Sequence, residues 1–219
     1  IVETEDAREK INRVLGIPLS DILVVGNTCH EVYDQPITEL YPIPGFDPEE
    51  FRMLTMSAGY PHKNLEIINP VSKHLQKNNL SFRFYVTLEP RDFSRIFDSN
   101  PCVTNLGPVK VTSGPSIYSR MNALFLPTLL ETFTSSYPEA MKMSIPILTS
   151  DLSFAHDICQ DAAEYFNPLD SYDIAQKIER IIRDPERRAM LVQKGTERLA
   201  KLETAAGRAA RFLDICMKH

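Results

Sequence analysis

The stretch of sequence most suggestive of chemistry is a hydroxyl-rich loop between two glutamates. Residues 131–139 read Glu-Thr-Phe-Thr-Ser-Ser-Tyr-Pro-Glu, and a helical pattern follows over residues 140–144. Hydroxyl side chains and the backbone N–H groups at a helix start are hydrogen-bond donors that suit a phosphate. Ionised carboxylates only accept hydrogen bonds, so Glu131 and Glu139 suit hydroxyl groups instead. One glutamate can hold a transferred sugar and the other a ribose.

The spacing of these glutamates decides little by itself. Two glutamates at this separation are common, and a glutamate near a helix start is usually a charge that complements the helix dipole. The elements around the loop must therefore decide whether it is a binding site.

Those elements predict a parallel sheet covered by helices. From residue 51 onward, short apolar segments alternate with amphipathic helical patterns. Residues 123–126 and 145–148 are apolar throughout, as expected of central strands buried on both faces. The predicted strands are residues 52–58, 81–88, 103–106, 122–126, 145–149 and 164–166. Ligands of such sheets bind beyond the carboxyl ends of the strands, which is where residues 131–139 begin.

The remaining segments predict helices and a linker. A helix over residues 171–184 has Asp170 or Ser171 as its N-cap, and residues 186–218 form one long or broken helix. Pro70 would kink a helix over residues 64–78 unless Asn69 caps a new one there. Before the sheet we expect a helix over residues 5–15, a strand over residues 22–25 and a proline-rich linker over residues 36–48.

Composition excludes several classes of protein. The net charge is −5 without a basic run, which argues against nucleic acid as a partner. The apolar stretches are too short for a transmembrane segment. Four scattered cysteines fit neither a zinc site nor a disulfide scaffold, so we expect a reducing, cytoplasmic setting. The missing Gly-x-Gly-x-x-Gly and Walker lysine loops argue against a dinucleotide oxidoreductase and an NTPase.

Several spaced segments resemble one known family. Residues 117–127 look like the helix and strand that lead into its motif, and residues 138–147 look like its Glu-Ala-Met, small residue, Pro and apolar strand; residues 151–168 continue in register. The family is the group-one (family four) retaining glycosyltransferases of the two-domain GT-B fold, named for a Glu-x7-Glu motif. The resemblance runs from about residue 51 to residue 182. It implies a Rossmann-like three-layer α/β/α sandwich with a six-stranded parallel sheet, the C-terminal half of a GT-B enzyme.

The resemblance also implies roles for single residues. Glu131 orients the transferred sugar and Lys63 neutralises the donor diphosphate, so these two are the catalytic candidates. Glu139 binds the ribose, and the base lies against the backbone at Val109. The other donor-binding candidates are His62, Phe133, Thr134, Ser135 and Ser136. Many members carry an arginine five residues before the lysine, where this chain has Ala58.

Domain divisions and partners follow from the same resemblance. Residues 1–48 correspond to a remnant of an N-terminal acceptor-binding domain and its linker, residues 49–200 to the donor-binding domain, and residues 201–219 to a C-terminal crossover helix. The chain opens at Ile1 without an initiator methionine, so we expect a piece of a longer protein. The expected partners are a UDP-sugar or GDP-sugar and the missing acceptor domain, through which the cytoplasmic face of a membrane can be contacted.

Two alternatives stay open at this point. Ala58 and the missing domain motivate a non-catalytic nucleotide-sugar-binding or regulatory module, and a doubly wound domain can also serve protein contact alone. No metal or other cofactor is expected, because Lys63 and a helix N-terminus supply the positive field and no Asp-x-Asp is found.

Overall fold

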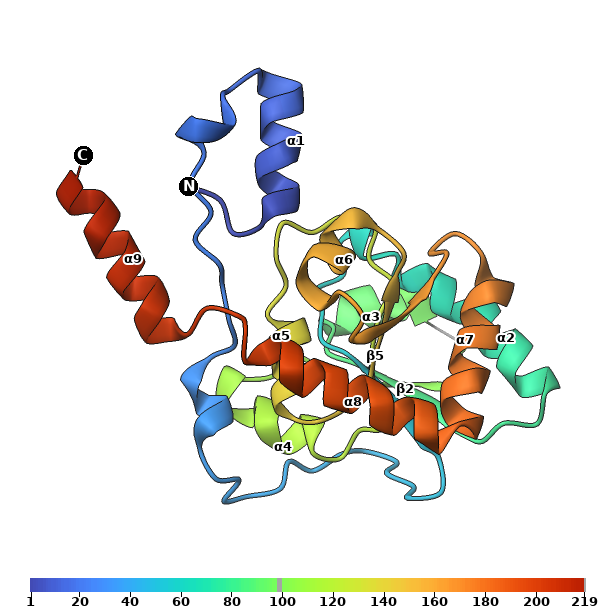
Figure 1. The fold of residues 1–219 in the computed structure, drawn as a ribbon. Helices are drawn as coiled ribbons and strands as arrows, with labels where there is room; N and C mark the ends of the chain where they lie inside the picture. The colour runs from blue at the N-terminus through green and yellow to red at the C-terminus, as the bar shows by residue number, and fades with distance from the viewer. Residues whose placement is uncertain (98–99, 219) are drawn as a thin grey trace.

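A six-stranded parallel sheet forms the centre of the chain in the computed structural model, which describes residues 1–97 and 100–218 (Figure 1). Every adjacent pair of strands runs parallel, in the order β3-β2-β1-β4-β5-β6. The strands are β1 (Phe51–Thr55), β2 (Phe82–Val86), β3 (Val103–Asn105), β4 (Ala123–Leu126), β5 (Ile147–Ser150) and β6 (Ala163–Phe166). All six predicted strands are confirmed. The first is shorter than expected, which puts Ala58 in the loop that follows it.

The strand order places a crevice at the middle of the sheet. The chain builds from β1 outward to β3 and then returns to the centre, where β4 pairs with β1 through Met53–Ala123 and Leu54–Leu124. The loops after β1 and β4 therefore lead to opposite faces of the sheet and leave room between them, as in other doubly wound folds. The predicted site residues of these two loops meet at this switch point.

Helices cover both faces of the sheet, as predicted for a three-layer sandwich (Figure 1). On one face, Phe84, Phe125 and Leu148 pack against α2 (Ile68–Lys77) and α7 (Ser171–Arg183), with α3 (Pro90–Phe97) beside them. On the other, Leu54 and Leu124 pack against α4 (Gly114–Tyr118), α5 (Ser136–Lys142) and α6 (Ser153–Cys159). The helix α8 (Pro185–Leu199) contacts both layers: Leu191 belongs to the first core, and Leu199 packs against the second. Alternate residues of each strand thus belong to opposite cores, which explains the continuous apolar runs.

Most of the helical expectations are confirmed. The helix α1 (Glu5–Leu15) forms as predicted, and Asp170 caps α7 by accepting hydrogen bonds from the backbone N–H groups of Tyr172 and Asp173. The terminal segment is broken: α8 ends at Leu199 and α9 (Ala205–Lys218) begins after a short connection. His219, the last residue of the expected crossover segment, lies outside the described residues.

Two expectations need correction. Asn69 is not a helix cap, because α2 begins at Ile68; Pro70 lies in the first turn of that helix, where backbone N–H groups have no intrahelical acceptor. Residues 22–25 do not form a strand. They make a single bridge between Val24 and Val2, since no neighbouring sheet in the described part of the chain extends the pairing.

The N-terminal segment and α9 lie outside the two core layers (Figure 1). They contact each other where Arg208 pairs with Glu3 at 3.1 Å and Arg211 donates to the Val24 carbonyl at 2.7 Å. Short 3-10 turns, η1 (Leu19–Asp21) and η2 (Glu31–Asp34), interrupt the first part of the chain, and the proline-rich residues 36–48 are irregular. Among the helices that the structure describes, none combines the length and the apolar character needed to cross a bilayer.

Candidate functional site

An ion pair joins the loops that follow the two central strands. The Lys63 ammonium Nζ lies 2.5 Å from Glu131 Oε1. Lys63 ends the 3-10 turn η3 (Pro61–Lys63), which follows β1, and Glu131 lies in the loop after β4. Their side chains are 20% and 11% exposed, so both charges are largely shielded from bulk water. The two predicted catalytic residues are therefore in direct contact.

Backbone hydrogen bonds hold these loops together and so position the pair. The His62 carbonyl accepts from the Leu129 backbone N–H at 2.7 Å and from the Thr128 hydroxyl at 3.2 Å. Asn64 adopts a left-handed conformation, and its side-chain amide donates to the carbonyls of Pro127 and Pro168. His62 thus contributes its backbone, and the loops after β1, β4 and β6 behave as one unit.

Glu139 is buried in the first turn of α5. Its side chain is 8% exposed, and its Oε2 accepts a hydrogen bond of 3.0 Å from the Tyr118 hydroxyl. Burial raises the pKa of the Glu139 carboxyl, while hydrogen bonding from Tyr118, Ser135 and Tyr33 opposes the rise. A solvated charge at a helix start would not be enclosed in this way. The Tyr118 phenol holds the carboxylate instead.

Two cavities adjoin Glu139. One of about 370 Å³ lies between the loops after β1 and β3 and is lined by Glu139 together with Ala58, Val109 and Lys110. The other, of about 600 Å³, lies between residues 27–30 and α9 and is lined by Glu139, Ser135 and Arg208, among others. Glu139 therefore forms a wall of both, and a ligand in either can reach its carboxylate.

The N-terminal segment contacts the loop between the glutamates. The hydroxyl of Thr4, which is buried, donates to the carbonyl of Thr132 at 3.0 Å. Two residues after Thr4, the backbone N–H of Asp6 donates to Asp157 of α6 at 2.9 Å. Residues before the linker thus help to hold the backbone next to Glu131.

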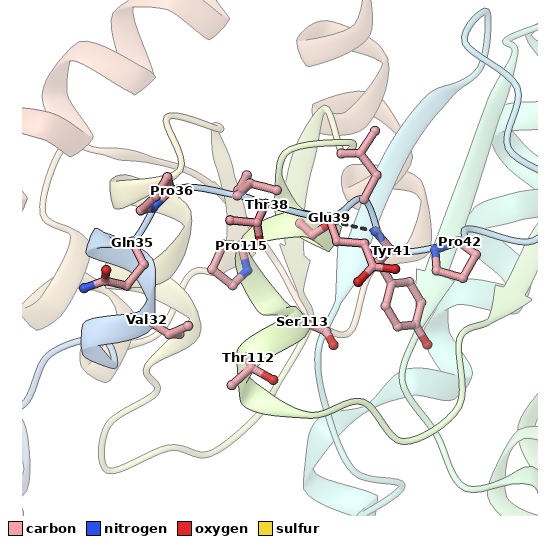
Figure 2. A pocket seen from close by; sticks show the side chains of 13 residues that line it. Val32, Gln35, Pro36, Thr38, Glu39, Tyr41, Pro42, Thr112, Ser113 and Pro115 are labelled. Atoms are coloured by element: carbon pink, nitrogen blue, oxygen red, sulfur yellow. Dashed lines mark hydrogen bonds between the residues drawn. The ribbon is translucent and has the colours of Figure 1, made fainter.

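A further cavity of about 570 Å³ lies between residues 32–42 and residues 112–116 (Figure 2). The linker forms one wall, where the Tyr41 backbone N–H donates to the Ser116 hydroxyl at 2.6 Å. Thr112 and Ser113 form another (Figure 2). None of the predicted site residues, all of which the structure describes, lines this cavity. It is separate from the site around Glu139.

Six of the nine predicted site residues fall into two groups. Lys63 and Glu131 pair, with the His62 backbone beside them, whereas Glu139, Ser135 and Val109 line the cavities. Of the others, Thr134 is half-buried in the loop, Ser136 is buried as the first residue of α5, and Phe133 packs partly buried against the second core. The sequence interpretation missed Tyr33, Tyr118 and Lys110. A lysine directly after Val109 was the one local signal, whereas the tyrosines reach Glu139 only through the fold.

The strand order and the helices on both faces define a Rossmann-like three-layer α/β/α class of domain. A family model described as "Glycosyl transferases group 1" matches residues 37–198, which is most of the chain. The chain belongs to this family. Among curated relatives, it is 28% identical over 184 residues to the capsular polysaccharide biosynthesis glycosyltransferase CapM of Staphylococcus aureus, covering 83% of this chain and 42% of that one.

Further similarities agree with this assignment. The O-antigen chain mannosyltransferase RfbU of Salmonella typhimurium is 26% identical over 145 residues, or 63% of this chain and 40% of the relative. Sucrose-phosphate synthase of Thermosynechococcus elongatus matches in fold with a TM-score of 0.77 at 17% identity, over 99% of this chain and 57% of that one. A TarM mutant of S. aureus, solved with UDP among its ligands, has a TM-score of 0.77 at 16% identity, over 97% of this chain and 42% of that one. The chain thus spans about two fifths of the length of the curated relatives it matches.

Proposed function

We propose that the chain is the donor-binding part of a retaining glycosyltransferase and binds a nucleoside-diphosphate sugar. The observation that carries this proposal is the shielded Lys63–Glu131 pair at the switch point of the sheet. Family membership supports it, as does the similar fold of TarM, which was solved with UDP. In this proposal, the sugar is transferred to a glycan, lipid or other acceptor with retention of anomeric configuration.

Lys63 is the group that meets the diphosphate. As the bond to the sugar breaks, negative charge builds on the leaving nucleoside diphosphate, and a fixed ammonium stabilises it. Ser135, the N-cap of α5, makes no side-chain capping hydrogen bond, so first-turn N–H groups near Ser136 can also face a phosphate. Glu131 fixes Lys63 and presents its second oxygen to the hydroxyls of the sugar.

Glu139 is the group that meets the ribose. Its carboxylate is acceptor-only when ionised, and a ribose diol offers two donors. The cavity of about 370 Å³ that it shares with Val109 supports placing the base against the backbone there. Phe133 and Thr134 complete the loop beside the donor in this proposal.

The expected arginine is replaced by Ala58, but a cation lies on the same cavity. Ala58 and Lys110 both line it, and Lys110 is exposed. Its side chain can therefore reach an anion bound there. In this proposal Lys110 takes the place of the expected arginine, and no metal is needed in the reaction.

The rest of the protein is part of the same proposal. Residues 1–48 and 201–219 would belong with an acceptor-binding domain that this chain does not contain, consistent with the share of its relatives that it spans. The names of two relatives refer to O-antigen chains and capsular polysaccharide, which makes a growing polysaccharide a suitable acceptor class. We place the reaction in the cytoplasm or at the cytoplasmic face of a membrane.

Calorimetry on the chain with UDP, GDP and their sugars tests donor binding. Binding of a nucleoside diphosphate with a dissociation constant below a millimolar level is expected. If none binds at millimolar concentration, the proposal fails. Turnover of the full-length protein, with and without Glu131→Ala, then separates an enzyme from a binding module, since only an enzyme loses transfer while retaining nucleotide binding.

A further inference from the structure

We propose that Tyr33 and Tyr118 are positioning residues that fix the orientation of the Glu139 carboxylate for the ribose. Through Tyr33, this orientation depends on the position of the turn η2. The inference rests on the proposed function, because it concerns how the same site holds its nucleotide. Neither tyrosine belongs to the motif that carries the glutamates.

Tyr118 holds one carboxylate oxygen of Glu139 through a hydrogen bond. It is fully buried at the end of α4, and its hydroxyl donates to Glu139 Oε2 at 3.0 Å. Burial and the neighbouring Glu139 charge raise the pKa of the phenol, which therefore stays protonated and remains a donor. The carboxylate cannot rotate without losing this bond in a buried setting, where an unsatisfied polar group is costly.

Tyr33 lies in η2, just before the linker, and lines the cavity of about 370 Å³ together with Glu139. It is the buried residue of η2, its ring meets the Tyr118 ring edge-on at 5.8 Å, and burial and Glu139 raise its pKa as well. Its hydroxyl fits here because residue 114 is glycine: a Cβ at Gly114 would lie 2.3 Å from it. The small residue and the phenol match each other.

An ion pair also joins the turn η2 to α5. Asp34, next to Tyr33, forms an ion pair with Lys142 at the end of the helix that carries Glu139. The turn η2 is therefore tied to the end of α5 by Asp34, while Tyr33 packs against the tyrosine that holds Glu139. A shift of η2 therefore moves Tyr33 relative to the Glu139 carboxylate.

Together, the two tyrosines preset the direction in which Glu139 accepts: Tyr118 donates to its Oε2, and Tyr33 packs against the Tyr118 ring and lines the same cavity as Glu139. The other lone pairs of the carboxylate can then accept from a ribose diol. A carboxylate that is oriented in advance binds the diol without first giving up rotational freedom. The expected effect of losing a phenol hydroxyl is therefore a loss of affinity specific to the ribose hydroxyls.

The test compares UDP with 2′,3′-dideoxyuridine diphosphate in calorimetry on the chain. Wild type should bind UDP more tightly than the dideoxy nucleotide. Tyr118→Phe and Tyr33→Phe should each weaken UDP about tenfold and change the dideoxy affinity by less than about twofold. Tyr137→Phe is the matched control, because it is an equally buried tyrosine whose hydroxyl contacts Thr149 instead. It should leave the ratio of the two affinities unchanged.

The outcomes separate this inference from the proposed function. If wild type binds neither nucleotide, the proposed function fails and the inference falls with it. If wild type discriminates but both phenylalanine variants keep its affinity ratio, or lose both ligands equally, only the inference is overturned. Thermal melts establish that each variant is folded, and Tyr33, at the edge of the core, provides the second variant if Tyr118→Phe does not fold.

Discussion

Replacing Lys63 by methionine is the most direct test of how the chain meets a diphosphate. The substitution keeps an unbranched side chain that is one atom shorter and removes its charge. We expect UDP binding to weaken while uridine, which has no phosphate, binds as before.

The magnitude follows from the geometry of the pair. The Lys63 ammonium makes a 2.5 Å charge-assisted contact and is only 20% exposed, so its bond to a phosphate oxygen will also be shielded. Hydrogen bonds to charged groups contribute about 1.5–3 kcal/mol, which corresponds to a rise in the dissociation constant of about 10- to 150-fold. The upper part of that range is expected, because Glu131 loses its cation and then repels the diphosphate.

The assay is calorimetry with UDP and uridine on three variants. Lys77→Met, at the exposed end of α2, controls for loss of a positive charge and should bind UDP like wild type. Lys63→Met combined with Glu131→Gln should bind UDP several-fold more tightly than Lys63→Met alone, because the repulsion is gone. The reasoning is refuted if Lys63→Met weakens UDP by less than about threefold, or weakens uridine to the same extent.

Three other substitutions probe the packing and the buried carboxyl. Gly114→Ala should lower the free energy of unfolding by about 1–3 kcal/mol in urea titration, because the new Cβ meets the Tyr33 hydroxyl at 2.3 Å; an unchanged midpoint would mean that Tyr33 has space to move. Ile178→Ala should lower it by about 2–5 kcal/mol, because Ile178 is fully buried between α7 and the sheet; a loss below about 1 kcal/mol would contradict that packing. Glu139→Gln should gain stability relative to wild type as the pH rises above 4.5, the ordinary pKa of a glutamate carboxyl. The raised pKa of Glu139 means that the folded state binds more protons than the unfolded state in that window, so wild type loses stability with rising pH there; a pH-independent difference between the two would contradict the shift.

The sheet was predictable because its signal is local. A strand buried on both faces is mainly apolar, and β4, residues 123–126, shows this directly. The apolar run at residues 145–148 located β5 within two residues, although that strand ends in the buried Thr149 and Ser150. The strand expected over residues 22–25 has the same apolar character but makes a single bridge. An apolar run shows that a segment needs a partner, and it does not show whether that partner is present.

The candidate site was predictable only in part, for a related reason. Glu131 and Glu139 lie in one loop and its helix, so their spacing and surroundings could be interpreted together. Their partners come from other parts of the chain. Lys63, the partner of Glu131, lies in the loop after β1; Tyr118, which donates to Glu139, ends α4, and Tyr33 beside it lies in η2. Such contacts depend on how the strands are ordered and on which residue, such as Gly114, leaves room for a side chain, and neither is visible in local spacing.

The contacts of residues 4–6 couple the start of the chain to the loop that carries Glu131. The Thr4 hydroxyl donates to the Thr132 carbonyl, and the Asp6 backbone N–H donates to Asp157 of α6. Hydrogen bonds of this kind contribute about 1 kcal/mol apiece. A displacement of residues 4–6 would therefore cost little, and it would free the carbonyl of the residue that directly follows Glu131.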